Sequence, residues 1–236
     1  SAKYLINNST FAPYFIKKEG QIYINTWHGI PLKKMGYDEP TSAFAVANTV
    51  RNFFHCDYLI SANPFLTEIY KKSYKQQGVS NVKIIEEGYP RFDTIVKKSK
   101  EEVYDELKKS GVSVDPNKKI ILYAPTWKGA NTNNPDLDID VFVKLKEKLE
   151  KLIDINEYQV LVKVHQFVFN KIREELMEFD YIVPATMDAN AILSITDILI
   201  SDYSSIYFDY LATERPLLFY IPDVEKYSKN RGMYFS

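Results

Sequence analysis

The chain has 236 residues, of which 45% are hydrophobic and 26% charged, so it is globular and long enough for two domains. A net charge of -1 excludes a global attraction to nucleic acid or to an anionic bilayer, and leaves only local basic patches to consider. The single cysteine, Cys56, excludes an intrachain disulfide, and its apolar neighbours predict a buried thiol.

The first part of the chain alternates short β-branched or aromatic runs with longer amphipathic ones. We expect strands at residues 3–7, 21–25, 58–61 and 83–86. A helix is expected at 64–74, because Asn63 is a good N-cap and Pro64 suits the first helical position.

The second part continues the same alternation. Helices are expected at 100–110, which stops at Gly111, and at 140–153, where apolar residues share one face. Strands are expected at 119–124, 159–164, 197–201 and 216–220. Several of these runs are apolar throughout, as in parallel strands that are covered on both faces, so we predict an α/β fold with parallel sheets.

A seam is expected between residues 95 and 115, where a lysine-rich helix is followed by a turn and a fresh strand. We therefore expect two Rossmann-like domains, residues 1–100 and 101–236, with ligands bound at the carboxyl ends of their strands in a central cleft. The chain opens almost inside a strand and stops in an aromatic stretch, so we expect the fold to be truncated at both ends.

Two histidines follow predicted strands, one in each expected domain. His28 comes after the strand at 21–25 and precedes Gly29, and Lys33 and Lys34 supply positive charge nearby. His165 comes after the strand at 159–164. Histidine suits proton transfer near neutral pH, although a capped turn in which His28 bonds to a neighbouring carbonyl explains its position equally well.

A third group of polar residues lies after the strand at 197–201. Ser204 and Ser205 fall where a helix is expected to begin, and exposed backbone N–H groups there would suit a diphosphate. Ordinary N-capping by serine is the alternative interpretation.

Further charged residues follow other predicted strands. They are Lys128, Arg91, Asp223 and Arg231, and each alone fits a surface ion pair as well as a ligand contact. No metal-ligand spacing is present, so we expect no structural zinc.

In these motifs the chain resembles the CDP-glycerol:poly(glycerophosphate) glycerophosphotransferase family of teichoic-acid polymerases and primases. The matching segments occur in the family's order and span nearly the whole chain: 25–29, 31–36, 123–127, His165, 201–205, 215–220 and 231–234. Lys128 stands where many relatives have arginine, and Gln166 where many have proline.

The resemblance implies a GT-B fold and transfer of glycerol phosphate, or a related polyol phosphate, from a CDP-polyol to a polymer hydroxyl with release of CMP. It implies that His28 is the base and that His165 serves the donor phosphates. Donor contacts are expected from Ser204, Ser205, Lys128, Asp209, Arg91, Asp223 and Arg231, and acceptor-side contacts from Trp27, Gly29, Lys33 and Lys34.

The resemblance also implies the partners. The donor would be CDP-glycerol or another CDP-polyol, and the acceptor a lipid-linked polyol phosphate or glycan of a teichoic-acid or capsular polymer. The enzyme would work in the cytoplasm at the inner face of the membrane, held there by segments that this chain lacks. We expect no required cofactor, although Mg²⁺ on the diphosphate would be compatible with the chemistry.

Two other functions remain open at this stage. One is a GT-B nucleotide-sugar glycosyltransferase or 2-epimerase, which would also use a helix N-terminus and an acidic ribose ligand. The other is an inactive binding module of a larger polymerase.

Overall fold

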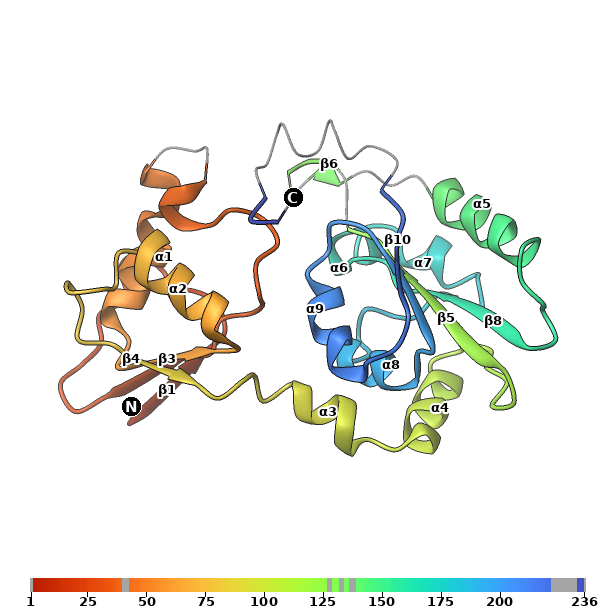
Figure 1. Ribbon diagram of the computed structural model, residues 1–236, viewed down its shortest axis with the longest axis horizontal. Helices are drawn as coiled ribbons and strands as arrows, with labels where there is room; N and C mark the ends of the chain where they lie inside the picture. The colour runs from red at the N-terminus through yellow and green to blue at the C-terminus, as the bar shows by residue number, and fades with distance from the viewer. Residues whose placement is uncertain are drawn as a thin grey trace. The chain divides into compact units, whose positions relative to one another are not determined.

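The computed structural model describes residues 2–39, 43–126, 129–131, 134–135, 139–221 and 233–235. The chain forms two compact units, residues 1–90 together with 223–236, and residues 91–222. Each unit is built around one four-stranded parallel sheet (Figure 1). The α/β class with parallel sheets is therefore confirmed.

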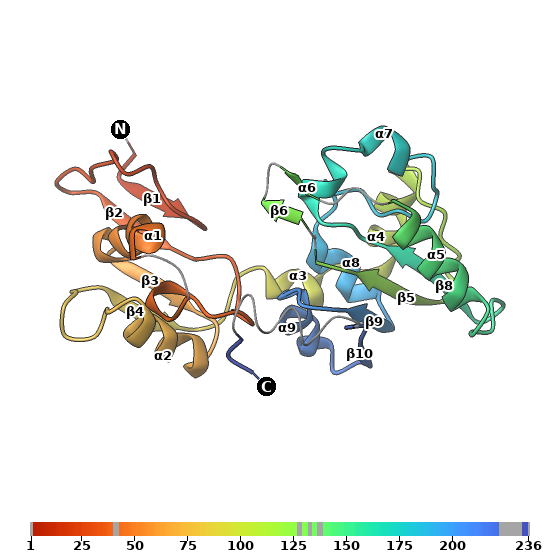
Figure 2. The ribbon, with the colours of Figure 1, turned by 90° about the horizontal axis from the view of Figure 1, so that it is seen from above.

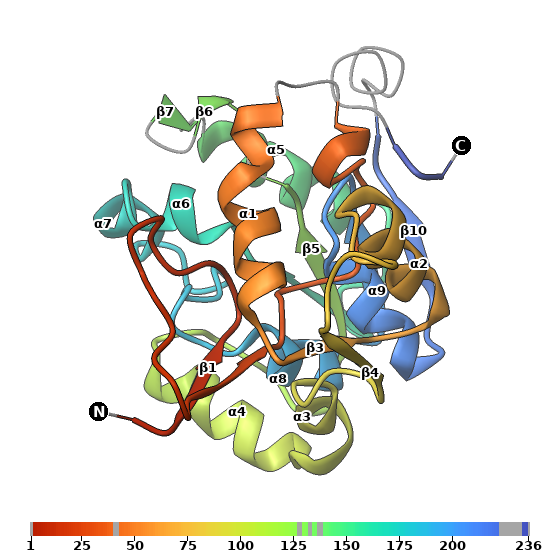
Figure 3. The same ribbon diagram turned by 90° about the vertical axis from the view of Figure 1, so that its left-hand side faces the viewer.

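The sheet of the first unit has the strand order β1-β2-β3-β4. Its strands are β1 (Tyr4–Asn7), β2 (Ile22–Asn25), β3 (Tyr58–Ser61) and β4 (Lys83–Glu86), and its helices are η1 (Gly36–Asp38), α1 (Ala43–His55) and α2 (Pro64–Ser73). Figure 3 shows α1 and α2 over the same face of the sheet. On that face Tyr23, Asn25 and Leu59 are fully buried, whereas Ile6, on the other face, is 70% exposed.

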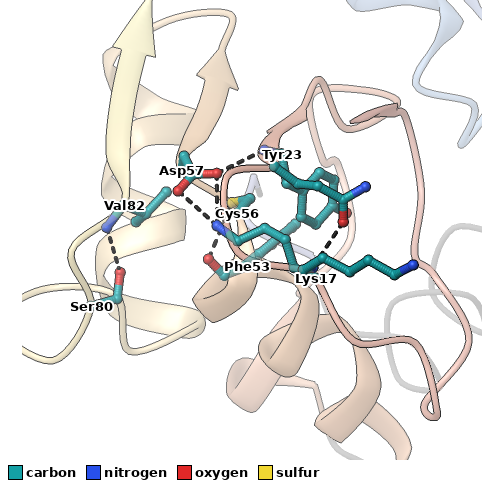
Figure 4. A network of polar contacts seen from close by, with 9 residues as sticks. Lys17, Tyr23, Phe53, Cys56, Asp57, Ser80 and Val82 are labelled. Carbon is teal, nitrogen blue, oxygen red and sulfur yellow. Dashed lines mark hydrogen bonds and ion pairs between the residues drawn. The ribbon is translucent and has the colours of Figure 1, made fainter. Parts of the chain in front are cut away.

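A polar clamp joins the amino ends of three strands in this unit (Figure 4). The ammonium of Lys17 lies 2.7 Å from both carboxylate oxygens of Asp57, and the N–H of Tyr23 donates to the same carboxylate at 2.7 Å. The carbonyl of Asp57 accepts from the N–H of Lys83. Burial alone would raise the pKa of Asp57, but the ion pair with Lys17 and the backbone donors outweigh burial and lower it.

The expected buried thiol is confirmed beside this clamp. Cys56 is 4% exposed and its Sγ donates to the carbonyl of Phe53 at 3.2 Å (Figure 4). Burial raises the pKa of Cys56 to about 12, so the thiolate that would react is scarce at neutral pH.

The sheet of the second unit has the strand order β10-β9-β5-β8 (Figure 2). Its strands are β5 (Lys119–Ala124), β8 (Tyr158–Val162), β9 (Ile198–Ser201) and β10 (Leu217–Phe219), beside an antiparallel pair of β6 (Gly129–Asn131) and β7 (Asn134–Pro135). The helices are α3 (Phe92–Lys97), α4 (Lys100–Lys109), α5 (Ile139–Glu150), α6 (Gln166–Phe169), α7 (Arg173–Leu176), α8 (Ala189–Ile195), α9 (Ile206–Tyr210) and η2 (Leu211–Thr213).

This second sheet is covered on both faces. Ile121 and Tyr123 pack with Phe142 and Leu145 of α5, and Ile120, which points the other way, is also fully buried. On the described residues, the strands expected from the apolar runs are all present, as are the helices expected at 64–74, 100–110 and 140–153.

The division into units differs from the seam expected between residues 95 and 115. It falls after Pro90, because α3 packs against α8 and η2 of the second unit. The chain end returns to the first unit, where Met233 bridges to Lys33 and the hydroxyl of Tyr234 accepts from the N–H of Met35 at 3.1 Å. Aromatic contacts explain this return, since Phe65 packs against Tyr234.

Candidate active site

His28 lies after the carboxyl end of β2 and packs against Trp27, which is buried and has a strained backbone conformation. Trp27 has a φ of 51°, in the left-handed region that tryptophan rarely adopts, and its N–H donates to Oδ1 of Asn25 at 2.8 Å. Trp27 is 7% exposed and its indole packs edge-on against Phe53. The centroids of the indole and of the His28 imidazole are 4.0 Å apart. The imidazole itself is exposed above this packed ring.

The hydrogen bond of His28 fixes its neutral tautomer. Nδ1 of His28 lies 3.0 Å from the carbonyl oxygen of Asn8. A carbonyl can only accept, so Nδ1 carries the proton and the lone pair of the neutral ring is on Nε2. This arrangement leaves His28 in the form that a general base requires.

The other acceptor-side candidates lie in the same segment. Gly29 is buried and its carbonyl accepts from the hydroxyl of Tyr89 at 3.3 Å. Lys33 is half-buried and Lys34 is exposed. Trp27 forms part of the core beneath His28, so its role toward an acceptor would be to support the histidine; contacts of these residues with an acceptor stay a prediction.

His165 follows β8 and is the N-cap of α6. Its Nδ1 accepts from the backbone N–H of Phe167 at 3.3 Å, and its carbonyl accepts from the N–H groups of Val168 and Phe169. Because Nδ1 accepts, the proton of the neutral ring is on Nε2. His165 is therefore arranged to donate a hydrogen bond from Nε2, the reverse of His28.

A half-buried lysine that sequence reasoning missed lies two residues before His165. The ammonium of Lys163 donates to the carbonyls of Pro184 and Met187 at 3.3 and 3.2 Å. Burial lowers the pKa of Lys163 to about 8, and the nearby carboxylate of Asp188 opposes this shift only in part. The signal in the sequence was a lysine that interrupts an otherwise apolar strand end.

The serine turn after β9 is tied to the neighbouring strand β5. The hydroxyl of Ser201 donates to the carbonyl of Ala124 at 2.8 Å, and the N–H of Thr126 donates to Oδ1 of Asp202 at 2.7 Å. In the order β9-β5-β8, the carboxyl ends of three adjacent parallel strands lie at one edge of the sheet. The segments that carry the serine turn, Thr126 and His165 follow those ends.

The helix expected to begin at the serines starts at Ile206 and spans five residues. Ser204 is half-buried and its hydroxyl accepts from the N–H of Ile206 at 3.4 Å, whereas Ser205 is exposed. Ser205 is the N-cap of α9 and makes no side-chain cap hydrogen bond, and the diphosphate role of the two serines stays a prediction.

Arg91 and Asp209, both expected as donor ligands, are bonded to each other. Nε and Nη2 of Arg91 lie 2.8 and 2.9 Å from the two oxygens of Asp209, a bidentate pair. Burial raises the pKa of Asp209, and the guanidinium of Arg91 opposes that rise only in part. A donor that used either side chain would have to share or displace this ion pair.

Three further candidates, Lys128, Asp223 and Arg231, lie outside the described residues. Within the described part of the chain, no three histidine, cysteine or acidic side chains gather in a way that could hold a metal ion. In the same part of the chain, none of the helices combines the length and the apolar character needed to cross a membrane. That the reaction needs no cofactor, with Mg²⁺ on the diphosphate as a compatible addition, stays a prediction.

Comparison with known proteins supplies relatives over the full chain. A teichoic acid poly(glycerol phosphate) polymerase of Bacillus spizizenii is 36% identical over 100% of this chain and 60% of the relative. A teichoic acid glycerol-phosphate transferase of Staphylococcus aureus is 33% identical over 99% of this chain and 61% of the relative. The chain thus spans about three fifths of the length of these relatives.

Among solved structures, a histidine-to-asparagine variant of the wall teichoic acid polymerase TagF, soaked with CDPG, matches with a TM-score of 0.73. It is 30% identical, over 99% of this chain and 56% of the TagF chain. The likeness confirms the GT-B type of α/β fold. The model of one family matches residues 1–236 in full, and the chain belongs to that family, CDP-Glycerol:Poly(glycerophosphate) glycerophosphotransferase.

Proposed function

We propose that this chain carries out the transfer of glycerol phosphate from CDP-glycerol to a hydroxyl of a growing teichoic-acid-type polymer, with release of CMP. The observation that carries the proposal is the pair of strand-end histidines with opposite tautomers, His28 with its lone pair on Nε2 and His165 with its proton there. Family membership over the whole chain and the glycerol-phosphate relatives support the same reaction.

In the proposed reaction, Nε2 of His28 takes the proton from the acceptor hydroxyl as its oxygen attacks the β-phosphorus of the donor. A bond forms between that oxygen and phosphorus, the bond from phosphorus to the bridging oxygen breaks, and CMP leaves with the electron pair. The proton stays on His28 until solvent removes it. General-base catalysis of this kind contributes about 10²–10⁴-fold to a rate.

The donor side of the proposal rests on the second unit. The N–H at Nε2 of His165 would donate to a phosphate oxygen as negative charge develops there, and the turn at Ser204 and Ser205 would contribute hydroxyls and backbone N–H groups. Lys128, where relatives have arginine, would add a point charge rather than a bidentate fork.

The partners follow from this chemistry. The donor is a CDP-polyol, with glycerol favoured by the glycerol-phosphate relatives, and TagF has been soaked with CDPG. We propose that the acceptor is a lipid-linked polyol phosphate and that the enzyme works on the cytoplasmic side of the membrane, where a CDP-polyol is made. The composition gives no reason to expect a nucleic acid partner.

The test measures ligand-induced thermal stabilisation and CMP release with CDP-glycerol, CDP-ribitol and a UDP-sugar, each with and without Mg²⁺. We expect CDP-glycerol to raise the melting temperature most, because a ligand that binds only the folded state stabilises it by mass action. CMP release should require a polyol-phosphate acceptor. Stabilisation by the UDP-sugar alone would support a sugar transferase or epimerase, and binding of CDP-glycerol without CMP release would support an inactive module.

A further inference from the structure

The fully buried amide of Asn25 lies between the two backbone segments that hold His28. Asn25 ends β2 and is 0% exposed. Its Oδ1 accepts from the N–H of Trp27 at 2.8 Å, and its Nδ2 donates to the carbonyl of Ser9 at 2.9 Å and to the hydroxyl of Tyr23 at 2.8 Å. Asn25 thus accepts from one segment through its side-chain carbonyl and donates to the other through its amide, which also donates to Tyr23 of its own strand.

The first segment is the turn that presents His28. The bond from the N–H of Trp27 to Asn25 closes an Asx turn, which holds Trp27 at its positive φ. Since His28 is the next residue, the turn sets where the imidazole leaves the backbone.

The second segment is the loop that contacts the imidazole. The carbonyl of Asn8, which accepts from Nδ1 of His28, belongs to the peptide group that also contains the N–H of Ser9. That N–H donates to Oδ1 of Asn7 at 2.8 Å, and the carbonyl of Ser9 accepts from Asn25. Both sides of Ser9 are therefore fixed, and with them the direction of the Asn8 carbonyl.

We propose that Asn25, assisted by Asn7, is a positioning residue that sets the tautomer and orientation of His28 for proton transfer. The inference deepens the proposed function, on which its kinetic consequence rests. Neither asparagine would touch the substrate. Their effect would pass through the Asn8 carbonyl, as when partners of a catalytic imidazole decide which of its nitrogens carries the proton.

Two variants test this role while leaving the turn at the end of β2 able to form. Asn25→Ser keeps a hydroxyl that can accept from the N–H of Trp27 but loses the amide that holds Ser9. Asn7→Ala, at a half-buried site, releases the N–H of Ser9 without touching the core. Tyr23→Phe is the matched control, because it removes a hydroxyl from the same cluster and leaves the bonds of Asn25 to Trp27 and Ser9 in place.

The readout is the tautomer of His28 from imidazole nitrogen and carbon chemical shifts in histidine-labelled protein, at a pH where the ring is neutral. The chain has three histidines, so assignment is direct. We expect the Nδ1–H form in the wild type and in Tyr23→Phe, and a shift toward the Nε2–H form in Asn25→Ser and Asn7→Ala. The kcat for CMP release should fall about 10- to 100-fold in both variants, with the KM for the donor unchanged.

An unchanged His28 tautomer in the folded variants overturns the proposal, and if Asn25→Ser does not fold, Asn7→Ala decides alone. A loss of kcat with the tautomer retained would show a structural role only and would also overturn it. The tautomer measurement needs no substrate. A wild-type protein that shows the expected tautomers but releases no CMP therefore contradicts the proposed reaction and leaves the positioning role standing.

Discussion

The two histidines of the candidate site follow the same kind of strand end, yet their rings are prepared in opposite ways. Nδ1 of His28 donates to a carbonyl, whereas Nδ1 of His165 accepts from a backbone N–H. The amide of Asn25 holds the loop that contacts His28, whereas His165 is itself the N-cap of α6. The same position after a strand can thus leave the proton of the neutral ring on Nδ1 in one unit and on Nε2 in the other.

The largest effect is expected at His28. His28→Ala should lower the rate of CMP release by about 10²–10⁴-fold, because the acceptor hydroxyl loses its base. His28→Gln should fare no better, since an amide cannot take the proton. Binding of CDP-glycerol, measured by thermal stabilisation, should survive in both variants. Near-normal turnover in His28→Ala would show that another group is the base.

A smaller and chemically different effect is expected at His165. His165→Ala should lower the rate about 10²–10³-fold, as for loss of one donor to developing negative charge. His165→Gln should recover part of that loss, because its amide supplies an N–H near the position of Nε2. Glutamine should therefore restore part of the rate at position 165 and none at position 28. Equal rates of CMP release in His28→Gln and His165→Gln would contradict the difference between the two histidines.

The ion pair of the second unit should carry measurable stability. Arg91→Gln leaves the largely buried carboxylate of Asp209 without its guanidinium, and we expect a loss of roughly 1–3 kcal/mol in the free energy of unfolding. Lys97→Gln removes an exposed ion pair with Asp93 on the same helix and should cost less than roughly 0.5 kcal/mol. Urea titrations measure both losses. Equal losses would show that the partly buried Arg91–Asp209 pair contributes no more to stability than the exposed Lys97–Asp93 pair.

The last effect concerns the ammonium of Lys163 and depends on pH. Its pKa is lowered to about 8 in the folded chain from 10.5, so between these values the unfolded chain binds more protons and stability rises with pH. Between pH 8 and about 9.5 the wild type should gain roughly 1–2 kcal/mol relative to Lys163→Met. Parallel pH profiles of the two proteins would show that Lys163 titrates normally.

Much of the fold could be predicted from the sequence because its signals are local. The apolar run at β5 predicted a strand, and Asn63 followed by Pro64 predicted the start of α2. The return of Tyr234 to the first unit could not be predicted, because it depends on contacts with residues nearly 200 positions earlier, such as Met35.

The candidate residues of the site could be chosen from the sequence, but their hydrogen bonds could not be predicted from it. His28 and His165 were evident from their places after strands, but the tautomer of each depends on a backbone group, the carbonyl of Asn8 or the N–H of Phe167. The sequence does not show which backbone group will lie beside a given side chain. The pairing of Arg91 with Asp209 was missed for a related reason, since residues 118 positions apart show no local pattern.

The most direct test of this account is the neutral tautomer of both catalytic candidates in one histidine-labelled sample of the wild-type protein. The chemical shifts should report the proton of His28 on Nδ1 and that of His165 on Nε2. Finding the same tautomer at both positions would contradict the division of roles between base and donor on which the proposed transfer of glycerol phosphate depends.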